Sequence, residues 1–272
     1  MKLSLEDLFE DIVDKAQHGL GINDQALSQR SGVGLEQIRS LKQGTGDPQS
    51  IPAVAAALGL GPAALAENYA KSWYPESVPA FGNVRQVNTP LIDMTVNAYL
   101  IWDLATKNAA IFDTGVDATE LLALVATEKL TVKYLFLTHT HDDHVAELGT
   151  LIKQTHAEIF SPELERVPDT RIVQEGDQFK LDNLWIEVRL TNGHSPGGTS
   201  FVIFGLETLV AVVGDSLFAG SIGGVSNGYQ EALRNNKKKL LSLPGDTLIC
   251  PGHGPLTTVA NEQKHNPFFA KE

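Results

Sequence analysis

The sequence is poor in cysteine, in basic side chains and in long apolar runs, and each shortage excludes a class of protein. The single cysteine, Cys250, rules out an intramolecular disulfide framework. Lys and Arg number 21 against 33 Asp and Glu, which gives a net charge of −12. Bulk affinity for nucleic acid depends on neutralising phosphates, so this balance argues against it.

The apolar residues are dispersed along the chain. No uninterrupted apolar run is long enough to span a bilayer, and the N-terminus lacks the basic-then-apolar order of a signal peptide. Together with the lone cysteine, these features predict a cytoplasmic protein without a membrane partner. With 272 residues, 42% of them apolar and 20% charged, the chain can form one large globular domain or two smaller ones.

Residues 1–72 show helical periodicity and no strand pattern. In the first helix, for example, Leu5, Leu8 and Phe9 share one face. The expected helices cover 3–16, two short segments within 22–44 around a glycine-bearing turn, 51–60 and 62–69. We therefore expect residues 1–72 to form a small all-α domain.

The order of these helices resembles the helix-turn-helix domain of Cro/C1-type phage-repressor regulators. The matching residues are Gln25, Ala26-Leu27, Ser31-Gly32-Val33, Ile38, Leu41, Gly44, Pro48 and Ala56-Ala57-Leu58-Gly59. In that family the second helix of the pair enters the major groove, which implies DNA contacts by Arg39 and Lys42. Residues 1–75 carry six Lys and Arg against nine Asp and Glu, however, which is a poor footprint for DNA. The alternative is a packing or dimerisation domain.

From residue 84 the pattern changes from helices to strands. Residues 73–83, which include Trp73 and Pro75, have little periodicity and are expected to be a linker. Strands are expected at 84–87, 96–102, 109–113, 133–137, 157–160, 171–173, 179–181, 184–190, 199–204, 208–213 and 247–250, and helices at 117–128, 143–154 and 229–243. Because strands dominate and helices intervene, residues 84–272 are expected to be an α/β domain with helices covering the sheet faces.

The stretch 138–144, Thr-His-Thr-His-Asp-Asp-His, holds three of the eight histidines. It lies between a predicted buried strand and a predicted helix, which is a usual place for a site in an α/β sheet. His139 and His141 can converge on one point from an extended turn, and Asp143 and His144 can point to a second position beside it. Imidazole and carboxylate are ligands for zinc, iron or manganese.

Three later residues share one arrangement, a polar side chain at a strand or hairpin end flanked by glycine. They are His194, Asp215 and His253. Glycine lets the backbone turn sharply and bring a short side chain to a crowded centre. Together with the first cluster they supply enough ligands for two adjacent metal ions, with Asp215 able to bridge.

This set resembles the metallo-β-lactamase superfamily, in which a His-x-His-x-Asp-His motif is followed by a His, a bridging Asp and a final His. The resemblance covers about residues 84–265 and implies an αβ/βα sandwich with the metals at one edge. It implies that one metal is held by His139, His141 and His194 and a second by Asp143, His144 and His253, with Asp215 shared. It also implies that Asp113 supports the ligand loop by orienting a histidine, the alternative being a turn cap.

Within the superfamily, the segments 214–223 and 251–258 resemble the glyoxalase II-like branch, which contains hydroxyacylglutathione hydrolases. Gly223-Gly224 stands where many relatives carry Gly-Arg, so the resemblance leaves open whether the substrate contains glutathione. It implies two divalent metal ions, with zinc expected and iron or manganese as alternatives. The implied partner is a small thioester or acyl ester, attacked by a metal-activated hydroxide that Asp143 and Asp215 position.

Other functions are compatible with the same residues. A single iron on His139, His194 and Asp215 would resemble a persulfide dioxygenase. Alternatively, the chain could be a DNA-binding regulator whose metal domain senses a metabolite. Phosphodiesterase branches are less compatible because residues 76–272 carry 15 Lys and Arg against 24 Asp and Glu. A dimer is plausible, although the sequence does not fix the oligomeric state.

Overall fold

The computed structural model describes residues 2–76, 81–92, 94–225 and 228–270. Residues 2–72, which we call the helical region, hold five α-helices and one 3₁₀ turn. These elements are α1 (Phe9–Leu20), α2 (Asp24–Ser31), α3 (Leu35–Lys42), η1 (Pro48–Ser50), α4 (Ile51–Leu58) and α5 (Pro62–Tyr69). The all-α character expected of this part of the chain is confirmed.

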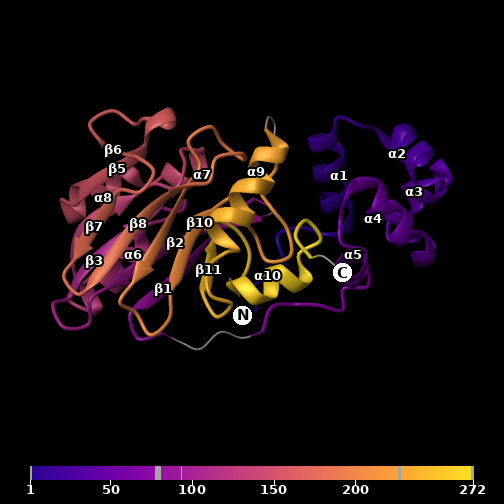
Figure 1. Cartoon of the computed structure of the whole chain (residues 1–272). Helices are drawn as coiled ribbons and strands as arrows, with labels where there is room; N and C mark the ends of the chain where they lie inside the picture. The colour runs from indigo at the N-terminus through magenta and orange to yellow at the C-terminus, as the bar shows by residue number, and fades with distance from the viewer. Residues whose placement is uncertain (1, 77–80, 93, 226–227, 271–272) are drawn as a thin grey trace.

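Residues 84–270, which we call the sandwich region, contain two six-stranded sheets that face each other (Figure 1). The first sheet has the order β1 (Val84–Leu91), β2 (Met94–Trp102), β3 (Asn108–Phe112), β4 (Thr131–Phe136), β5 (Glu158–Pro162) and β6 (Arg171–Val173). The second has the order β12 (Thr257–Thr258), β11 (Leu248–Pro251), β10 (Val210–Gly214), β9 (Thr199–Phe204), β8 (Leu184–Leu190) and β7 (Gln178–Leu181). In the first sheet, β3 pairs with β4, β4 with β5 and β5 with β6 in parallel. In the second sheet, β10 and β11 are parallel.

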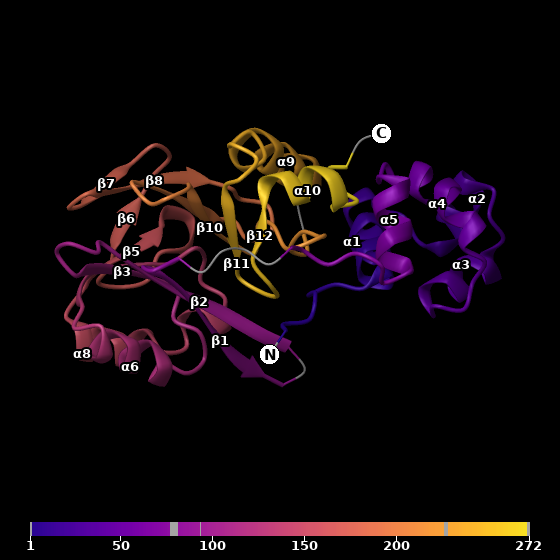
Figure 2. The same ribbon diagram turned by 90° about the horizontal axis from the view of Figure 1, so that it is seen from below.

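Helices cover both outer faces of the sandwich (Figure 2). The first sheet is covered by α6 (Thr119–Thr127) and α8 (Leu148–Thr155), and the second by α9 (Tyr229–Asn235), which continues into a π-helical turn (Asn236–Leu240), and by α10 (Val259–His265). Aromatic residues fill the space between the sheets, and the Phe136 ring stacks on Phe160 and Phe112 there. Cys250 is buried in this core. The α/β sandwich preceded by a helical region is therefore confirmed.

Several element boundaries differ from the prediction. The first helix begins at Phe9 rather than residue 3, because Asp11 accepts a hydrogen bond from the Leu8 nitrogen and caps the helix there. The helix expected over 143–154 is two helices, α7 (Asp142–Val145) and α8, and the helix expected over 229–243 ends at Leu240. The sequence prediction also missed α10. Within the described ranges, no helix combines the length and apolar character needed to cross a membrane.

Candidate metal centre

All seven predicted metal ligands lie at one edge of the sandwich, just beyond the carboxyl ends of four strands. The cluster at 139–144 follows β4 and includes α7, and His194 follows β8. Asp215 is the residue directly after β10, and His253 follows β11 by two residues. Each strand thus ends in a loop that delivers its polar side chain to the same place.

Three imidazoles form the first group of converging ligand atoms. The Nδ1 atom of His141 lies 3.1 Å from Nε2 of His139 and 3.0 Å from Nε2 of His194. His139 is buried, whereas His141 is exposed. The group therefore has one open side, which is the arrangement that a metal site needs if it is to admit a substrate or water.

The second group consists of Asp143, His144 and His253. The Oδ2 atom of Asp143 lies 3.6 Å from Nε2 of His144 and 3.4 Å from Nε2 of His253. Both histidines are buried, and the carboxylate of Asp143 is partly exposed. This set of nitrogen and oxygen ligands suits zinc, iron or manganese.

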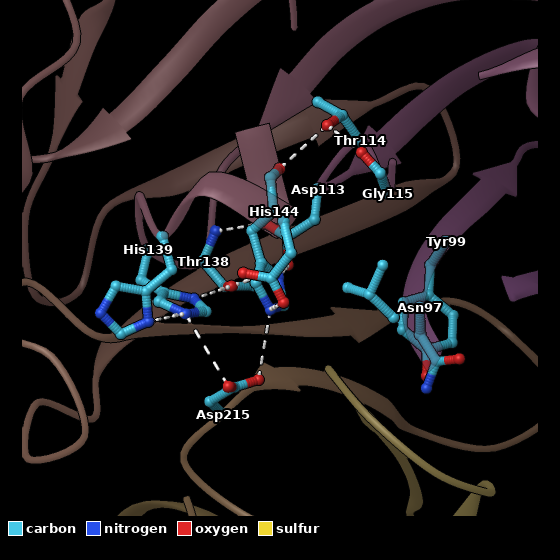
Figure 3. A network of polar contacts seen from close by, with 12 residues as sticks. Asn97, Tyr99, Asp113, Thr114, Gly115, Thr138, His139, His144 and Asp215 are labelled. Atoms are coloured by element: carbon cyan, nitrogen blue, oxygen red, sulfur yellow. Dashed lines mark hydrogen bonds and ion pairs between the residues drawn. The ribbon is translucent and has the colours of Figure 1, made fainter. Parts of the chain in front are cut away.

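The carboxylate of Asp215 lies between the two groups (Figure 3). Its Oδ1 atom is 3.4 Å from Nε2 of His144, and its Oδ2 atom is 3.4 Å from Nε2 of His194 and 3.3 Å from Nε2 of His253. Gly252 makes this position accessible, because a Cβ added there would lie 2.1 Å from Asp215 Oδ1. The geometry brings together all the residues predicted to hold two metals.

Two buried atoms of the centre indicate that a cation fits it. His144 Nε2 and Asp215 Oδ1 have no hydrogen-bond partner among the residues that the structure describes. A buried polar atom without a partner is costly, so native proteins rarely leave one. A divalent ion between these atoms would satisfy both.

The ligand histidines are oriented by partners on their far sides. Asp113 accepts hydrogen bonds from the Thr138 nitrogen at 2.7 Å and the Thr138 hydroxyl at 2.8 Å, and its Oδ2 lies 2.9 Å from Nδ1 of His144. Nδ1 of His194 lies 2.8 Å from the carbonyl oxygen of Gly224, and Nδ1 of His253 lies 2.7 Å from that of Thr95. Each such contact places the proton on Nδ1 and leaves the Nε2 lone pair directed at the centre.

The electrostatics of the centre favour an ionised Asp215. Burial raises its pKa, but the charges of His144 and His253 hold that pKa well below its usual range. Burial, followed by repulsion from the His144 charge, holds the pKa of His139 well below its usual range. Burial lowers the pKa of His144, but the charges of Asp215 and Asp113 hold that pKa well above its usual range. A metal ion bound to His144 would therefore displace a proton from its ring.

Three residues that support the centre were not predicted. Glu165 accepts hydrogen bonds from Ser195 Oγ and the Gly197 nitrogen, both at 2.7 Å, and so braces the loop that carries His194. On β2, Asn97 Nδ2 donates to the Pro251 oxygen at 2.9 Å and the Tyr99 hydroxyl donates to it at 2.6 Å. No local sequence pattern signals these roles, because every partner is more than 29 residues away.

A pocket of about 360 Å³ opens beside the first ligand group. Its lining residues are His141, Asn192, Gly193, His194, Ser195, Pro196, Gly228 and Glu231. A substrate in this pocket would therefore contact the exposed side of the centre.

The two predicted DNA contacts lie on α3, far from this centre (Figure 1). Lys42 pairs with both Asp14 and Asp24, and Arg39 lies 2.7 Å from Glu36. Carboxylates thus already neutralise both cations. DNA binding stays a prediction, and this pairing gives it no support.

Comparisons with known proteins agree with this geometry. Residues 91–253 match the family described as the metallo-beta-lactamase superfamily. The chain is 34% identical over 211 residues to hydroxyacylglutathione hydrolase GloC of Haemophilus influenzae, a match that covers 67% of this chain and 98% of GloC.

Two solved structures extend the comparison. The structure of BLEG-1 B3 metallo-beta-lactamase is similar with a TM-score of 0.62 and 29% identity, covering 69% of this chain and all of that one. The structure of ETHE1 from Myxococcus xanthus has a TM-score of 0.60 and 26% identity, covering 68% of this chain and 84% of that one. This chain therefore belongs to the metallo-β-lactamase superfamily, whose members bind divalent metals and are typically hydrolases.

Proposed function

We propose that this chain is a binuclear metal-dependent hydrolase that cleaves a small thioester or a related acyl ester, with zinc as the expected metal. The observation that carries the proposal is the completeness of both ligand groups around one carboxylate. Asp215 lies within 3.4 Å of ligand atoms from each group. Two metals sharing one carboxylate are the arrangement used for hydrolysis by several enzyme classes.

Bound in these groups, two divalent ions would supply a water of lowered pKa and polarise the carbonyl under attack. The chain's own residues would position the attacking water. Asp143 and Asp215 offer carboxylate oxygens that can accept hydrogen bonds from the attacking water and orient it. A thiolate leaves with little need for protonation, so a thioester is the substrate class for which these residues suffice.

The similarity to GloC supports the thioester class, because its name describes a hydroxyacylglutathione hydrolase and the match spans 98% of its length. Among the residues that the structure describes, those that line the pocket beside His141 and His194 include Glu231 and Asn192 but no Lys or Arg. Glutathione carries two carboxylates, for which basic side chains are the usual partners. We therefore propose the thioester bond, rather than glutathione itself, as what the site recognises.

The test is hydrolysis of S-lactoylglutathione and of simpler thioacetates by purified, metal-analysed protein. Asp143→Ala should abolish turnover, because it removes a ligand of the second group. Asp142→Ala is the matched control, since that neighbouring carboxylate is exposed and belongs to neither ligand group. Full metal occupancy without turnover of any thioester would contradict the proposal.

A second candidate is an iron-dependent oxidation of the persulfide dioxygenase type. His139, His194 and Asp215 form a set of two histidines and one carboxylate, a ligand set typical of mononuclear iron oxygenases. Their atoms are suitably close, with Asp215 Oδ2 3.9 Å from Nε2 of His139 and 3.4 Å from Nε2 of His194. Oxygen uptake with a glutathione persulfide by iron-loaded protein, unaffected by Asp143→Ala, would favour this candidate over the hydrolase.

A further inference from the structure

The helical region reaches the loop that follows β10 through its first residues. Residues 2–8 are not helical, and they run along the sandwich region before entering α1 (Figure 2). Asp7 is buried and accepts hydrogen bonds from Lys15 Nζ and Ser221 Oγ. Lys15 Nζ also donates to the carbonyl oxygen of Ile222 at 2.9 Å. One carboxylate and one lysine thus tie α1 to this loop.

The same segment touches the turn that carries His253. A Cβ added to Gly254 would lie only 3.3 Å from the Glu6 nitrogen, so the two backbones are in close contact. Lys15 Nζ lies 5.1 Å from the centre of the Phe218 ring. That ring in turn meets the His253 ring edge-on, with the two centres 5.6 Å apart.

A third path joins α1 to His194 through α9. The Tyr229 ring packs on Gly19 of α1, where an added Cβ would lie 2.3 Å from the ring. One turn later in α9, Ala232 packs on Gly193, where an added Cβ would lie 2.3 Å from the Ala232 Cβ. Gly193 directly precedes His194, so the packing of α9 against α1 helps to fix the position of His194, a member of the first ligand group.

These contacts belong to a continuous apolar core rather than to a loose domain interface. Ile12 of α1 and Leu65 of α5 are fully buried in the same cluster as Val213 of β10 and Ile249 of β11. The helical region lies outside residues 91–253, which match the superfamily. Its contacts with two ligand-bearing loops, and with a third through α9, are therefore an addition of this chain to the matched region.

We propose that the helical region is a structural part of the metal centre, and that Asp7 and Lys15 are positioning residues for Asp215 and His253. This inference rests on the metal centre of the proposed function but not on the identity of its substrate. Over its described residues, 216–225, the loop after Asp215 has little regular structure beyond a single bridge between Phe218 and Ser221. Its position therefore depends on its anchors, and metal–ligand distances tolerate deviations of only about 0.2 Å.

The test is metal affinity in the full-length chain, measured by competition between the metal-free protein and a chromogenic zinc chelator. Lys15→Met removes the anchor and should weaken at least one of the two zinc-binding steps by about 10-fold. Lys42→Met is the matched control. The Lys42 side chain is 18% exposed against 20% for Lys15, and it also pairs with carboxylates, but only within the helical region. Its zinc affinity should equal that of the unmodified protein.

Ser221→Ala is a gentler variant, because it removes only the hydrogen bond to Asp7 and leaves the ion pair with Lys15 intact. It should weaken zinc binding in the same direction but by less. Equal zinc affinities for Lys15→Met and Lys42→Met would overturn the proposal, even in a protein that hydrolyses thioesters. Should Lys15→Met not fold, unchanged affinity in Ser221→Ala would overturn it instead. Weakened zinc binding in a protein without thioesterase activity would sustain this proposal and remove the substrate assignment.

Discussion

Asp215 in the metal centre and Glu262 on α10 are both buried carboxyl groups, yet their surroundings give them opposite properties. Burial raises the pKa of Asp215, but His144 and His253 more than reverse this and hold it well below the usual range. Burial also raises the pKa of Glu262, and there the result is a value of about 7. The partners of Glu262 are neutral donors: the Thr257 hydroxyl, the Gly220 nitrogen and the Asn266 amide.

The difference teaches that the charge of the neighbours, rather than burial alone, decides the state of a buried carboxyl group. The Asp215 carboxylate stays ionised, and a metal cation can bind between it and the neighbouring histidines. Glu262 instead ties α10 to Gly220, in the loop that follows Asp215. The ionised carboxylate of Asp215 is suited to holding metal ions, whereas the carboxyl group of Glu262 is suited to anchoring α10. Substitutions of the two residues should therefore have different effects.

The largest effect is expected from Asp215→Asn. The amide keeps the shape but removes the charge shared by both ligand groups, so both metals should bind more weakly. We expect kcat/KM for a thioester to fall by about 10³-fold or more, since the metals supply the nucleophile. Metal content and turnover would be measured on the same sample. A variant that kept both metals and more than a tenth of the activity would contradict the shared role of Asp215.

Glu262→Gln should change the dependence of stability on pH. A carboxyl whose folded-state pKa is raised from 4.5 to about 7 binds more protons in the folded than in the unfolded state between these values. Its contribution to stability is therefore greatest below pH 4.5, falls as the pH rises to about 7, and is constant above that.

For a fully buried group this fall is about 3 kcal/mol. The Gln variant cannot ionise, so its free energy of unfolding minus that of the unmodified protein should rise from pH 4.5 to 7 and then level off. Urea unfolding of metal-free protein would measure this difference. Glu36→Gln, at an exposed site, is the control. A difference that does not vary with pH would mean that the pKa of Glu262 is close to its unfolded value.

Asp113→Asn should have a smaller effect that is confined to metal binding. Asp113 contacts His144 of the second group through Oδ2, and no ligand of the first group directly. Loss of such a supporting carboxylate typically costs about 10- to 100-fold in metal affinity. Zinc titration should therefore show one weakened step and one step that changes little. Equal weakening of both steps would show that Asp113 supports the whole ligand loop through Thr138.

The gathering of the seven candidate ligands at one place could be predicted because its signals are local. Each residue lies near a strand end, and Gly193 and Gly214 have positive φ angles that favour glycine, whereas Gly252 leaves space for Asp215. A Cβ added to Gly214 would lie 2.4 Å from the Thr138 hydroxyl, which explains the glycine beside Asp215. The strand and helix patterns predicted an α/β domain, whereas the two-layer sandwich was implied by the resemblance to the superfamily.

The attachment of the helical region could not be predicted, because it depends on distant partners. Leu5 and Leu8 fall on the apolar face of the predicted helix, yet residues 2–8 are not helical. Asp7 instead pairs with Ser221, 214 residues away. Likewise, Glu165 accepts a hydrogen bond from Ser195, which lies 30 residues away in the sequence. Periodicity reports which face of an element is apolar, but it does not report which distant polar group will satisfy a buried charge.

The smallest effect is expected from Glu6→Gln, which removes a partly buried carboxylate near the metal centre. Its pKa is raised by burial first, and the charges of His253 and Asp215 then act on it in opposite directions, which places the carboxylate within electrostatic reach of both. A negative charge there should favour a cationic leaving group over an anionic one. With acetylthiocholine, its neutral carbon isostere and S-acetyl thioglycolate as substrates, Glu6→Gln should lower kcat/KM for the cation about 3-fold and raise it similarly for the anion. The neutral ester should be unaffected, since a structural disturbance would slow all three alike. Equal changes for the three esters would therefore mean that Glu6 acts only through its packing on Gly254 and that its charge does not reach the substrate.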